Sequence, residues 1–412
     1  MRLLAASLLA ISVAPCAVAS GEHEWEWGSR ARYAHVDADN SGQAASLLLR
    51  GSVASEWSDI FHSMVEVDAV GTAFKNDHSD GARFNNQPLI PDPDGIDLNQ
   101  VFLSLNLDAA AIHLGRQRIN FDNQRFIGGN GFWQNEQTFD ALLGKFKLAS
   151  NSNFTYSYIA NANRIFGEDA DGKNSQPEHD YGNGNGNGNG NGNGNSSPDS
   201  AFFGDHQHHS HLTRLEWNEW DYTRVVGYAY RIDNRDMPSA SNNTVGVSYN
   251  LNYKARRIKY RVQIEAAQQN RFELHAENLP YYLLDLGFGF NSWELSTRYE
   301  ILGANNGAAF ITPLGSNHDF EGWADEIGNT PNSGVRNFSL GLLWRASPLR
   351  VETSYHFFKD DVAGNNIGRE LDLDFVYKPN RKHSISLRLA NFEPETGSGS
   401  VRKVYLDYAF NL

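Results

Sequence analysis

Residues 119–137 combine aromatic and amide side chains in a way that suits sugar binding. The segment places Arg125 among aromatic residues, and most of its other polar side chains are amides. Aromatic faces stack on sugar rings, and amides hydrogen-bond to hydroxyl groups. The aromatic residues are Phe121, Phe126, Phe132 and Trp133, and the amides are Asn123, Gln124, Asn130, Gln134 and Asn135. We predict that this segment either contacts a glycan or packs its aromatic residues against a neighbouring wall.

Two other groups of residues have some features of metal sites. Four histidines lie close together and either bind a transition metal or form a solvated loop cluster; they are His206, His208, His209 and His211. The run from Asp92 to Asp97 contains three aspartates but lacks the downstream glutamate of an EF-hand calcium loop. The sequence contains no Gly-x-Ser-x-Gly motif, paired-cysteine site or phosphate loop. We therefore predict no catalytic residue, no bound metal and no cofactor.

The N-terminal residues have the features of a secretory signal peptide. Arg2 precedes the apolar segment 3–13, and Ala17-Val18-Ala19 forms an A-x-A cleavage site. We predict a signal peptide over 1–19, and a lipoprotein anchored through Cys16 is the alternative. The 412 residues include 35 basic and 49 acidic ones, so we expect no nucleic-acid partner. After position 20, no uninterrupted apolar run is long enough for a helical membrane span.

Alternation of apolar and polar residues dominates the rest of the chain. In 404–412 the even positions carry Val, Leu, Tyr, Phe and Leu. Strict alternation indicates strands with one apolar and one polar face. Eighteen such strands are predicted, most of them about ten residues long, which suffices to cross a bilayer at a tilt. They lie near 25–36, 46–57, 60–71, 98–107, 111–118, 138–147, 153–161, 210–219, 223–233, 243–253, 257–268, 280–290, 292–302, 335–345, 348–358, 368–378, 382–392 and 401–412.

The connections between these strands alternate between short and long. Connections that follow even-numbered strands are short, whereas 72–97, 119–137, 162–209 and 303–334 are long and polar. This arrangement is typical of outer-membrane barrels with short periplasmic turns and long extracellular loops. We therefore predict one all-β domain over 20–412, an antiparallel transmembrane barrel in the outer membrane of a Gram-negative bacterium. A soluble secreted β-protein is the alternative.

The two faces of the predicted strands suit different surroundings. The polar faces carry too many charges for a dry core, so we expect them to line an aqueous lumen while the apolar faces contact lipid. Aromatic residues near strand ends would form the interfacial girdles; they are Trp25, Trp27, Trp57, Trp217, Trp293, Trp344, Tyr228, Tyr230, Tyr249, Tyr253 and Tyr408. The Gly-Asn repeat 182–195 is predicted to be a disordered part of an extracellular loop, either as a flexible tether or without a role.

Two separated blocks of sequence resemble the alginate-export family of outer-membrane proteins. The first block contains Gly115 to Gln117, Arg125 to Gly128 and Trp133 to Asp140, and the second runs from Leu314 to Asp325. The resemblance implies an eighteen-stranded monomeric barrel, in agreement with the strand count. It also implies export of a polysaccharide.

A channel for alginate, which is a polyanion, should have a lumen rich in Arg and Lys. Strand parity instead predicts a mixed wall with twelve basic and fifteen acidic residues. The basic residues are Arg30, Arg32, Arg50, Arg214, Arg231, Lys259, Arg261, Arg298, Arg345, Arg350, Arg388 and Lys403. The acidic residues are Glu26, Glu56, Glu66, Asp68, Asp140, Glu216, Glu265, Asp285, Glu294, Glu300, Glu352, Glu370, Asp372, Asp374 and Asp407. This balance weakens the case for alginate, although one narrow basic ring would suffice to select it.

Arg116 and Arg118 do not fit the alternation of their strand. Ile112 and Leu114 face lipid in the predicted strand, so strict alternation would place both arginines there as well. Charge within the lipid is costly at the midplane of the membrane. We predict that the strand bends at Gly115 and turns both arginines inward.

These observations together predict a passive channel for a hydrophilic solute, in particular an oligo- or polysaccharide. An outer-membrane barrel enzyme and a general small-solute porin unrelated to alginate are the alternatives. The expected partners are the solute, outer-membrane lipid and a periplasmic protein at the short-turn face, and the expected state is a monomer. The predicted pore residues are Arg116, Arg118, Arg125, Phe126, Trp133, Gln134, Asp140, Arg261, Arg298 and Arg350.

Overall fold

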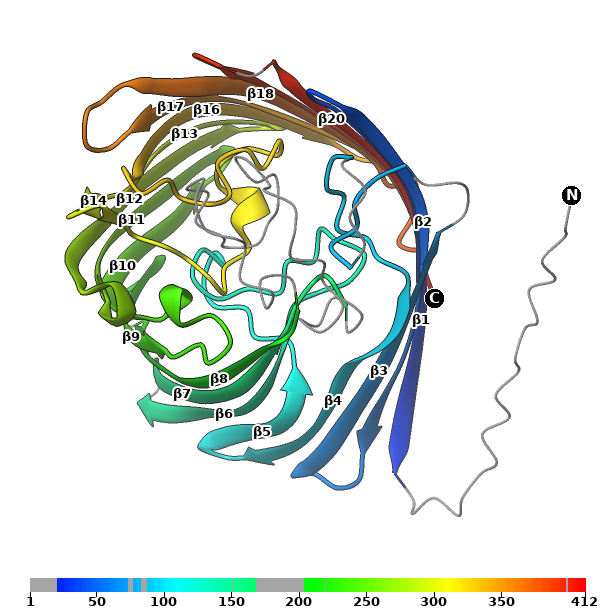
Figure 1. Ribbon diagram of the computed structural model, residues 1–412. Helices are drawn as coiled ribbons and strands as arrows, with labels where there is room; N and C mark the ends of the chain where they lie inside the picture. The colour runs from blue at the N-terminus through cyan, green and yellow to red at the C-terminus, as the bar shows by residue number, and fades with distance from the viewer. Residues whose placement is uncertain are drawn as a thin grey trace, which may run out of the picture.

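The computed structural model describes residues 21–72, 77–82, 87–149, 151–167, 204–218, 220–397 and 399–412. These residues form a closed ring of 18 antiparallel strands, which confirms the predicted fold (Figure 1). The first strand closes the ring by pairing with both the second and the last strand. The predicted signal peptide 1–19 and the Gly-Asn repeat 182–195 lie outside the described residues.

Every barrel strand overlaps its predicted range, and the differences are confined to the ends. The strands are β1 (Glu22–Asp37), β2 (Ser41–Glu56), β3 (Phe61–Thr72), β4 (Gly95–Leu107), β5 (Ala110–Gln117), β6 (Thr138–Ala149), β7 (Ser152–Asn163), β8 (His206–Trp217), β9 (Thr223–Ile232), β10 (Asn242–Ala255), β11 (Ile258–Arg271), β12 (Ala276–Phe290), β13 (Trp293–Leu302), β16 (Val335–Ala346), β17 (Leu349–Asp360), β18 (Asn366–Tyr377), β19 (His383–Pro394) and β20 (Val401–Asn411).

In the described residues, a few short elements lie in connections between the barrel strands. They are the small hairpin of β14 (Ala304–Asn305) and β15 (Ala308–Ala309), and the 3-10 helices η2 (Pro238–Ala240), η3 (Phe272–Leu274) and η4 (Asn317–Asp319). None of the helices in the described parts of the chain is long and apolar enough to cross a membrane.

The faces of the strands are apolar outside and polar inside. On β3, Val65 and Val67 expose 37% and 41% of their surface, whereas the intervening Glu66 and the following Asp68 expose 5% and 2%. A water-soluble barrel would show the opposite arrangement, because its apolar side chains fill the centre. The outward face therefore contacts lipid and the charged face lines the lumen, as predicted.

The inward and outward faces of β9 are exchanged relative to the prediction. Tyr228 and Tyr230 were expected in a girdle, but they are 5% and 3% exposed and point into the lumen. Arg231 was expected in the lumen, but its side chain lies on the outward face and is 52% exposed. The physical reason is packing, because both tyrosine rings lie against Phe126 of a loop that fills this part of the lumen.

Two long loops fold back into the barrel and meet each other. They cover 118–137, between β5 and β6, and 303–334, between β13 and β16. Figure 1 shows the first in cyan and the second in yellow, inside the ring of strands. Ile127 and Leu314 form a parallel bridge, and the Gly128 amide donates to the Leu314 carbonyl at 2.9 Å. The lumen is therefore narrowed from within by two segments that are distant in sequence.

Candidate pore constriction

Gly115 allows the end of β5 to leave regular strand geometry. Its φ of +128° is unfavourable for residues with a side chain, and a Cβ there would collide with the Val101 carbonyl. Three residues later, Arg118 forms ion pairs with Glu66 and Glu136 on the lumen side. The chain thus bends at the predicted glycine, and Arg118 reaches the lumen.

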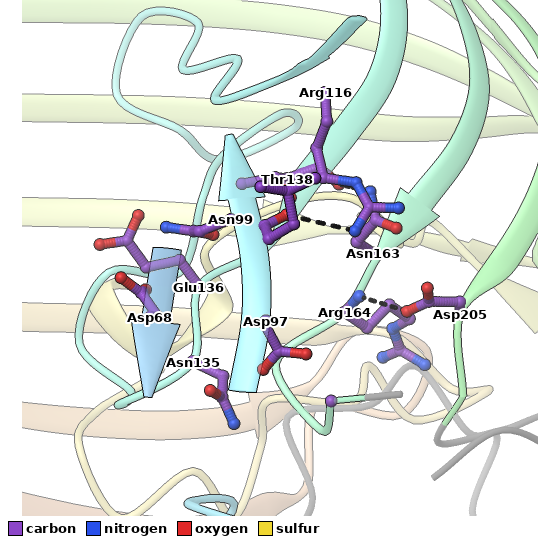
Figure 2. A pocket seen from close by; sticks show the side chains of 12 residues that line it. Asp68, Asp97, Asn99, Arg116, Asn135, Glu136, Thr138, Asn163, Arg164 and Asp205 are labelled. Atoms are coloured by element: carbon purple, nitrogen blue, oxygen red, sulfur yellow. Dashed lines mark hydrogen bonds between the residues drawn. The ribbon is translucent and has the colours of Figure 1, made fainter. Parts of the chain in front are cut away.

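Arg116 and Asp140 form an ion pair between β5 and β6. The Nε of Arg116 lies 2.7 Å from Oδ1 of Asp140. Arg116 also lines a narrow cavity with Asp68, Glu136 and Asn163, which Figure 2 shows from close by. The cavity measures about 20 Å³, little more than one water molecule requires. Arg116 and Asp140 therefore brace the wall beside a space that is too small for a sugar.

Arg125 is the centre of a buried ion cluster that ties both loops to the wall. Its side chain is 1% exposed, and its Nε lies 2.8 Å from Oε1 of Glu300 on β13. It also pairs with Glu321 and donates to Asn317 at 3.0 Å, both in loop 303–334. Burial opposes the charge on Arg125, but the attraction of Glu300 and Glu321 outweighs it and raises the pKa of the guanidinium. The guanidinium therefore stays charged and locks the two loops together.

Gln134 and Trp133 are also anchors within the loop. Both are almost fully buried. The Gln134 backbone amide donates to Oδ1 of Asp92 at 2.9 Å, and Arg30 donates to the Gln134 side chain at 2.7 Å. Asp92 is fully buried and lies 3.5 Å from Arg32. This aspartate of the calcium-like run is thus an anchor for loop 118–137.

Aromatic packing fills the lumen on the side of β9 to β12. The Phe126 ring lies 5.4 Å from Tyr228, 5.1 Å from Tyr281 and 5.8 Å from Phe310. Tyr228 and Tyr230 stack at 4.9 Å. Such contacts between rings exclude water and stabilise the docked loop. This side of the lumen is therefore filled by packed side chains.

The far side of the ring, toward β19, β20 and β1, leaves an open space of about 370 Å³. This volume is within the usual range of ligand pockets. Its lining combines one aromatic ring, two amides and two charges of each sign. The residues are Phe132, Asn120, Gln124, Arg118, Arg388, Glu136 and Asp319.

Phe132 is held between cationic and aromatic groups at the edge of this open space. Its ring stacks on His318 at 3.9 Å, and the guanidinium groups of Arg32 and Arg388 lie 4.3 and 4.6 Å from its centre. Arg388 also donates to Nε2 of His318 at 2.8 Å. The ring and the guanidinium of Arg388 are thus fixed at the boundary of the open space.

His318 is anchored from the opposite side by a buried carboxylate. Its Nδ1 lies 2.7 Å from Asp325, which also pairs with Lys403 of β20 at 3.1 Å. Burial lowers the pKa of His318, because the attraction of Asp325 does not compensate for the loss of water. A neutral His318 can accept the hydrogen bond from Arg388.

The remaining predicted pore residues lie on the wall strands, outside this cluster. Arg261 and Arg298 share Asp285, at 2.6 and 2.9 Å. Arg350 pairs with Asp374 at 2.5 Å, and Arg388 lies 3.7 Å from the same carboxylate. Among the acidic residues of β18, Asp374 thus lies between Arg350 and Arg388. These pairs alternate in sign around the lumen, so the wall is mixed.

The histidine cluster is divided by the alternation of β8. His206 and His208 are buried on the inward face, whereas His209 and His211 are exposed on the outward face. Among the described residues, no three His, Cys, Asp or Glu side chains are placed to hold a metal ion.

Comparison with known proteins agrees with the fold and with part of the sequence. Residues 30–164 match the alginate export family. This match confirms the resemblance noted from the sequence and covers β1 to β7 with the constriction loop 118–137. No curated relative matches the chain.

Solved outer-membrane channel structures share the architecture at low identity. OccAB4 of Acinetobacter baumannii is similar with a TM-score of 0.68 and 10% identity, over 95% of this chain and 98% of that one. OccK5 of Pseudomonas aeruginosa is similar with a TM-score of 0.66 and 10% identity, also over 95% of this chain and 98% of that one. OpdK of Pseudomonas aeruginosa, solved with vanillate, is similar with a TM-score of 0.67 and 10% identity, over 95% of this chain and 98% of that one. The barrel is thus that of a Gram-negative outer-membrane protein, as predicted.

The alginate export match ends before the residues that complete the constriction. Phe132 and Arg118 lie inside the matched segment, whereas His318, Asp319 and Arg388 lie beyond it. Arg388 was predicted to line the lumen, whereas His318 and Asp319 were not predicted as pore residues. A signal was nevertheless present, because the second block, Leu314 to Asp325, contains both and the structure docks it on the first block.

Proposed function

We propose that this protein is a passive outer-membrane channel whose solute is an oligo- or polysaccharide. The observation that supports this best is the open space of about 370 Å³ between the docked loops and the wall. It offers a partly exposed ring, Phe132, beside the amides of Asn120 and Gln124. These groups suit a sugar, since the exposed edge of the Phe132 ring offers an apolar contact while hydroxyl groups exchange hydrogen bonds with the amides. Passage would need no covalent step and no cofactor.

The charges around this space favour a solute that is not a strong polyanion. Arg118 and Arg388 are balanced by Glu136 and Asp319. An anion-selective pore would need an excess of basic groups at its narrowest part. We therefore expect weak ion selectivity, and neutral or sparsely charged glycans should enter at least as well as alginate. A general small-solute porin is the second candidate, because the same wall passes any small hydrophilic molecule.

Planar-bilayer recording tests this proposal. We expect open single-channel steps, with cation and anion permeabilities within about threefold in a salt gradient. Added maltohexaose should interrupt the current, and the Phe132→Ala substitution should shorten each interruption by about 2- to 10-fold, as expected for one lost apolar contact. Phe338→Ala, which removes an outward ring of β16, is the matched control. A protein that never conducts would refute the channel, and conductance without any block by glycans would favour the general porin.

A further inference from the structure

Three basic residues lie at outward-facing positions near the long-loop ends of β16, β17 and β18. Figure 1 shows that these three strands are neighbours in the ring. Arg336 stands directly opposite Lys359, and Arg369 stands opposite Phe357, two positions before Lys359. Neighbouring strands are about 4.8 Å apart, so the three backbone positions fit within about 10 to 12 Å. We refer to Arg336, Lys359 and Arg369 as the rim cluster.

Rows of lipid-facing residues lead up to the rim cluster. Phe338 and Phe357 lie two positions below Arg336 and Lys359; they are 39% and 43% exposed, and their rings are 6.1 Å apart. From Leu349 to Lys359, β17 rises about 34 Å, or about 26 Å along the membrane normal at a tilt of about 40°. The apolar band of such barrels is about 25 Å tall, so Lys359 reaches the lipid headgroups.

The charges of the rim cluster are not fully compensated by the protein. Arg336 pairs with Asp361 at 2.7 Å, and Arg369 pairs with Glu393 at 2.8 Å. The exposed Lys359 side chain has no ion pair or hydrogen bond with any described residue. Like charges directly opposite each other destabilise a pair of strands, and this applies to Arg336 and Lys359. An anion between them would remove the repulsion.

Two other parts of the outward rim lack this uncompensated charge. On β12 and β13, the outward residues in register with Arg336 are Tyr282 and Ile301. On β20, Arg402 donates to Asn391 at 3.3 Å and lies 3.7 Å from Asp37. The unpaired cation at Lys359 is thus a local feature of the β16 to β18 sector.

We propose that the rim cluster binds the phosphate group of a lipid in the outer leaflet, with the phosphorylated glycolipid lipid A as the ligand. Guanidinium groups donate paired hydrogen bonds to phosphate oxygens, and a lysine adds a point charge. The acyl chains of the same lipid would lie along Phe338, Phe357 and Leu371 below. This site is on the outer wall and does not depend on which solute crosses the lumen.

Native mass spectrometry of the detergent-solubilised barrel tests this proposal. We expect the protein to retain lipid A and to bind the dephosphorylated form, which has the same acyl chains, at least 5-fold less. The triple variant Arg336→Gln, Lys359→Gln and Arg369→Gln should lose about 10-fold in lipid A affinity. Lys359→Gln alone breaks no internal contact and should lose about 3-fold without affecting folding. Inorganic phosphate at 10 mM should neither bind measurably nor displace the lipid.

Lys382→Gln, at a short turn on the other side of the membrane, is the matched control and should bind lipid A like the original protein. The proposal is wrong if the original protein binds both forms of the lipid equally, or if the Lys359→Gln protein retains full affinity. Displacement by inorganic phosphate would mean a site for free phosphate and would also overturn it. Migration of the folded barrel on unheated gels verifies that each variant is intact.

Discussion

Loop 118–137 packs differently on the two sides of the lumen. Toward β9 to β12, loop 118–137 presents Phe126, whose ring is surrounded by other rings and is 8% exposed. Toward β19 to β1, six residues later, it presents Phe132 at the edge of an open space of about 370 Å³. One side is filled by buried rings and the other keeps an open space. The docked loops thus reduce the wide lumen by filling one half of it with packed side chains.

Arginine residues show the same division. Arg125, on the filled side, is enclosed by two carboxylates and has no access to water. Arg388, on the open side, is 20% exposed; it hydrogen-bonds to His318 and lies 3.7 Å from a single carboxylate, Asp374. The buried arginine ties the loops together, whereas the partly exposed one keeps its charge at the edge of the open space. The residue type alone does not separate these roles.

Removing the buried cation should have the largest effect on this division. Arg125→Met leaves Glu300 and Glu321 buried without a partner, which destabilises the docked loops by on the order of 3–5 kcal/mol. We expect a larger and noisier single-channel conductance, because the filled side opens. Arg116→Met is the control, since its partly exposed pair with Asp140 is worth at most about 1 kcal/mol. Unchanged conductance for Arg125→Met would show that the packing alone holds the loops.

Alanine substitutions of Phe126 and Phe132 should distinguish a residue that packs the filled side from one that borders the open space. Phe126→Ala removes a buried ring and should destabilise the docked loop by on the order of 3 kcal/mol, measured by hydrogen exchange of 118–137. Phe132→Ala should reduce the hydrogen-exchange protection of 118–137 much less, because the Phe132 ring is partly exposed. It should nevertheless enlarge the open space beside the loop. If both variants lose equal protection, the distinction between a filled and an open side is wrong.

Opposite charge changes on the open side should move ion selectivity in opposite directions. We expect Arg388→Gln to favour cations and Asp319→Asn to favour anions, each by about two- to threefold in the permeability ratio, because each leaves the other sign in excess. Reversal potentials in a salt gradient measure both shifts. Arg345 is a half-exposed side chain at the periplasmic end of the wall, so Arg345→Gln should change the permeability ratio less. Shifts of the same sign would place one of the two residues outside the conducting path.

A smaller effect is expected from pH, with opposite signs at two points of loop 303–334. Burial raises the pKa of Glu321 to about 8 from 4.5, so its contribution to docking is complete below about pH 4.5 and is lost as the pH rises to about 8. Burial lowers the pKa of His318, so its contribution is lost as the pH falls below about 6.5. Hydrogen exchange of the loop, corrected for intrinsic rates, should rise a few-fold in each case. Glu321→Gln should abolish only the alkaline response.

The alternation of apolar and polar residues predicted the barrel well, because successive side chains of each strand face lipid on one side and the lumen on the other. It misplaced the faces of β9, where Tyr228 and Tyr230 suit a girdle as well as a packed interior. The burial of Arg125 was not predictable in the same way. Its partners Glu300 and Glu321 lie 175 and 196 residues away, and no local pattern connects them. The bend at Gly115 was predictable, because Arg116 and Arg118 fall on the positions of their strand that alternation assigns to lipid.

The long separation between Arg125 and its partners also sets an order of assembly. Contacts of high contact order form late, since the intervening chain must be in place first. Loop 118–137 can dock early through Gln134 on Asp92 and Arg30, whereas the cluster around Arg125 also needs β13 and loop 303–334. The narrowing of the lumen is therefore complete only when these distant parts of the chain have come together.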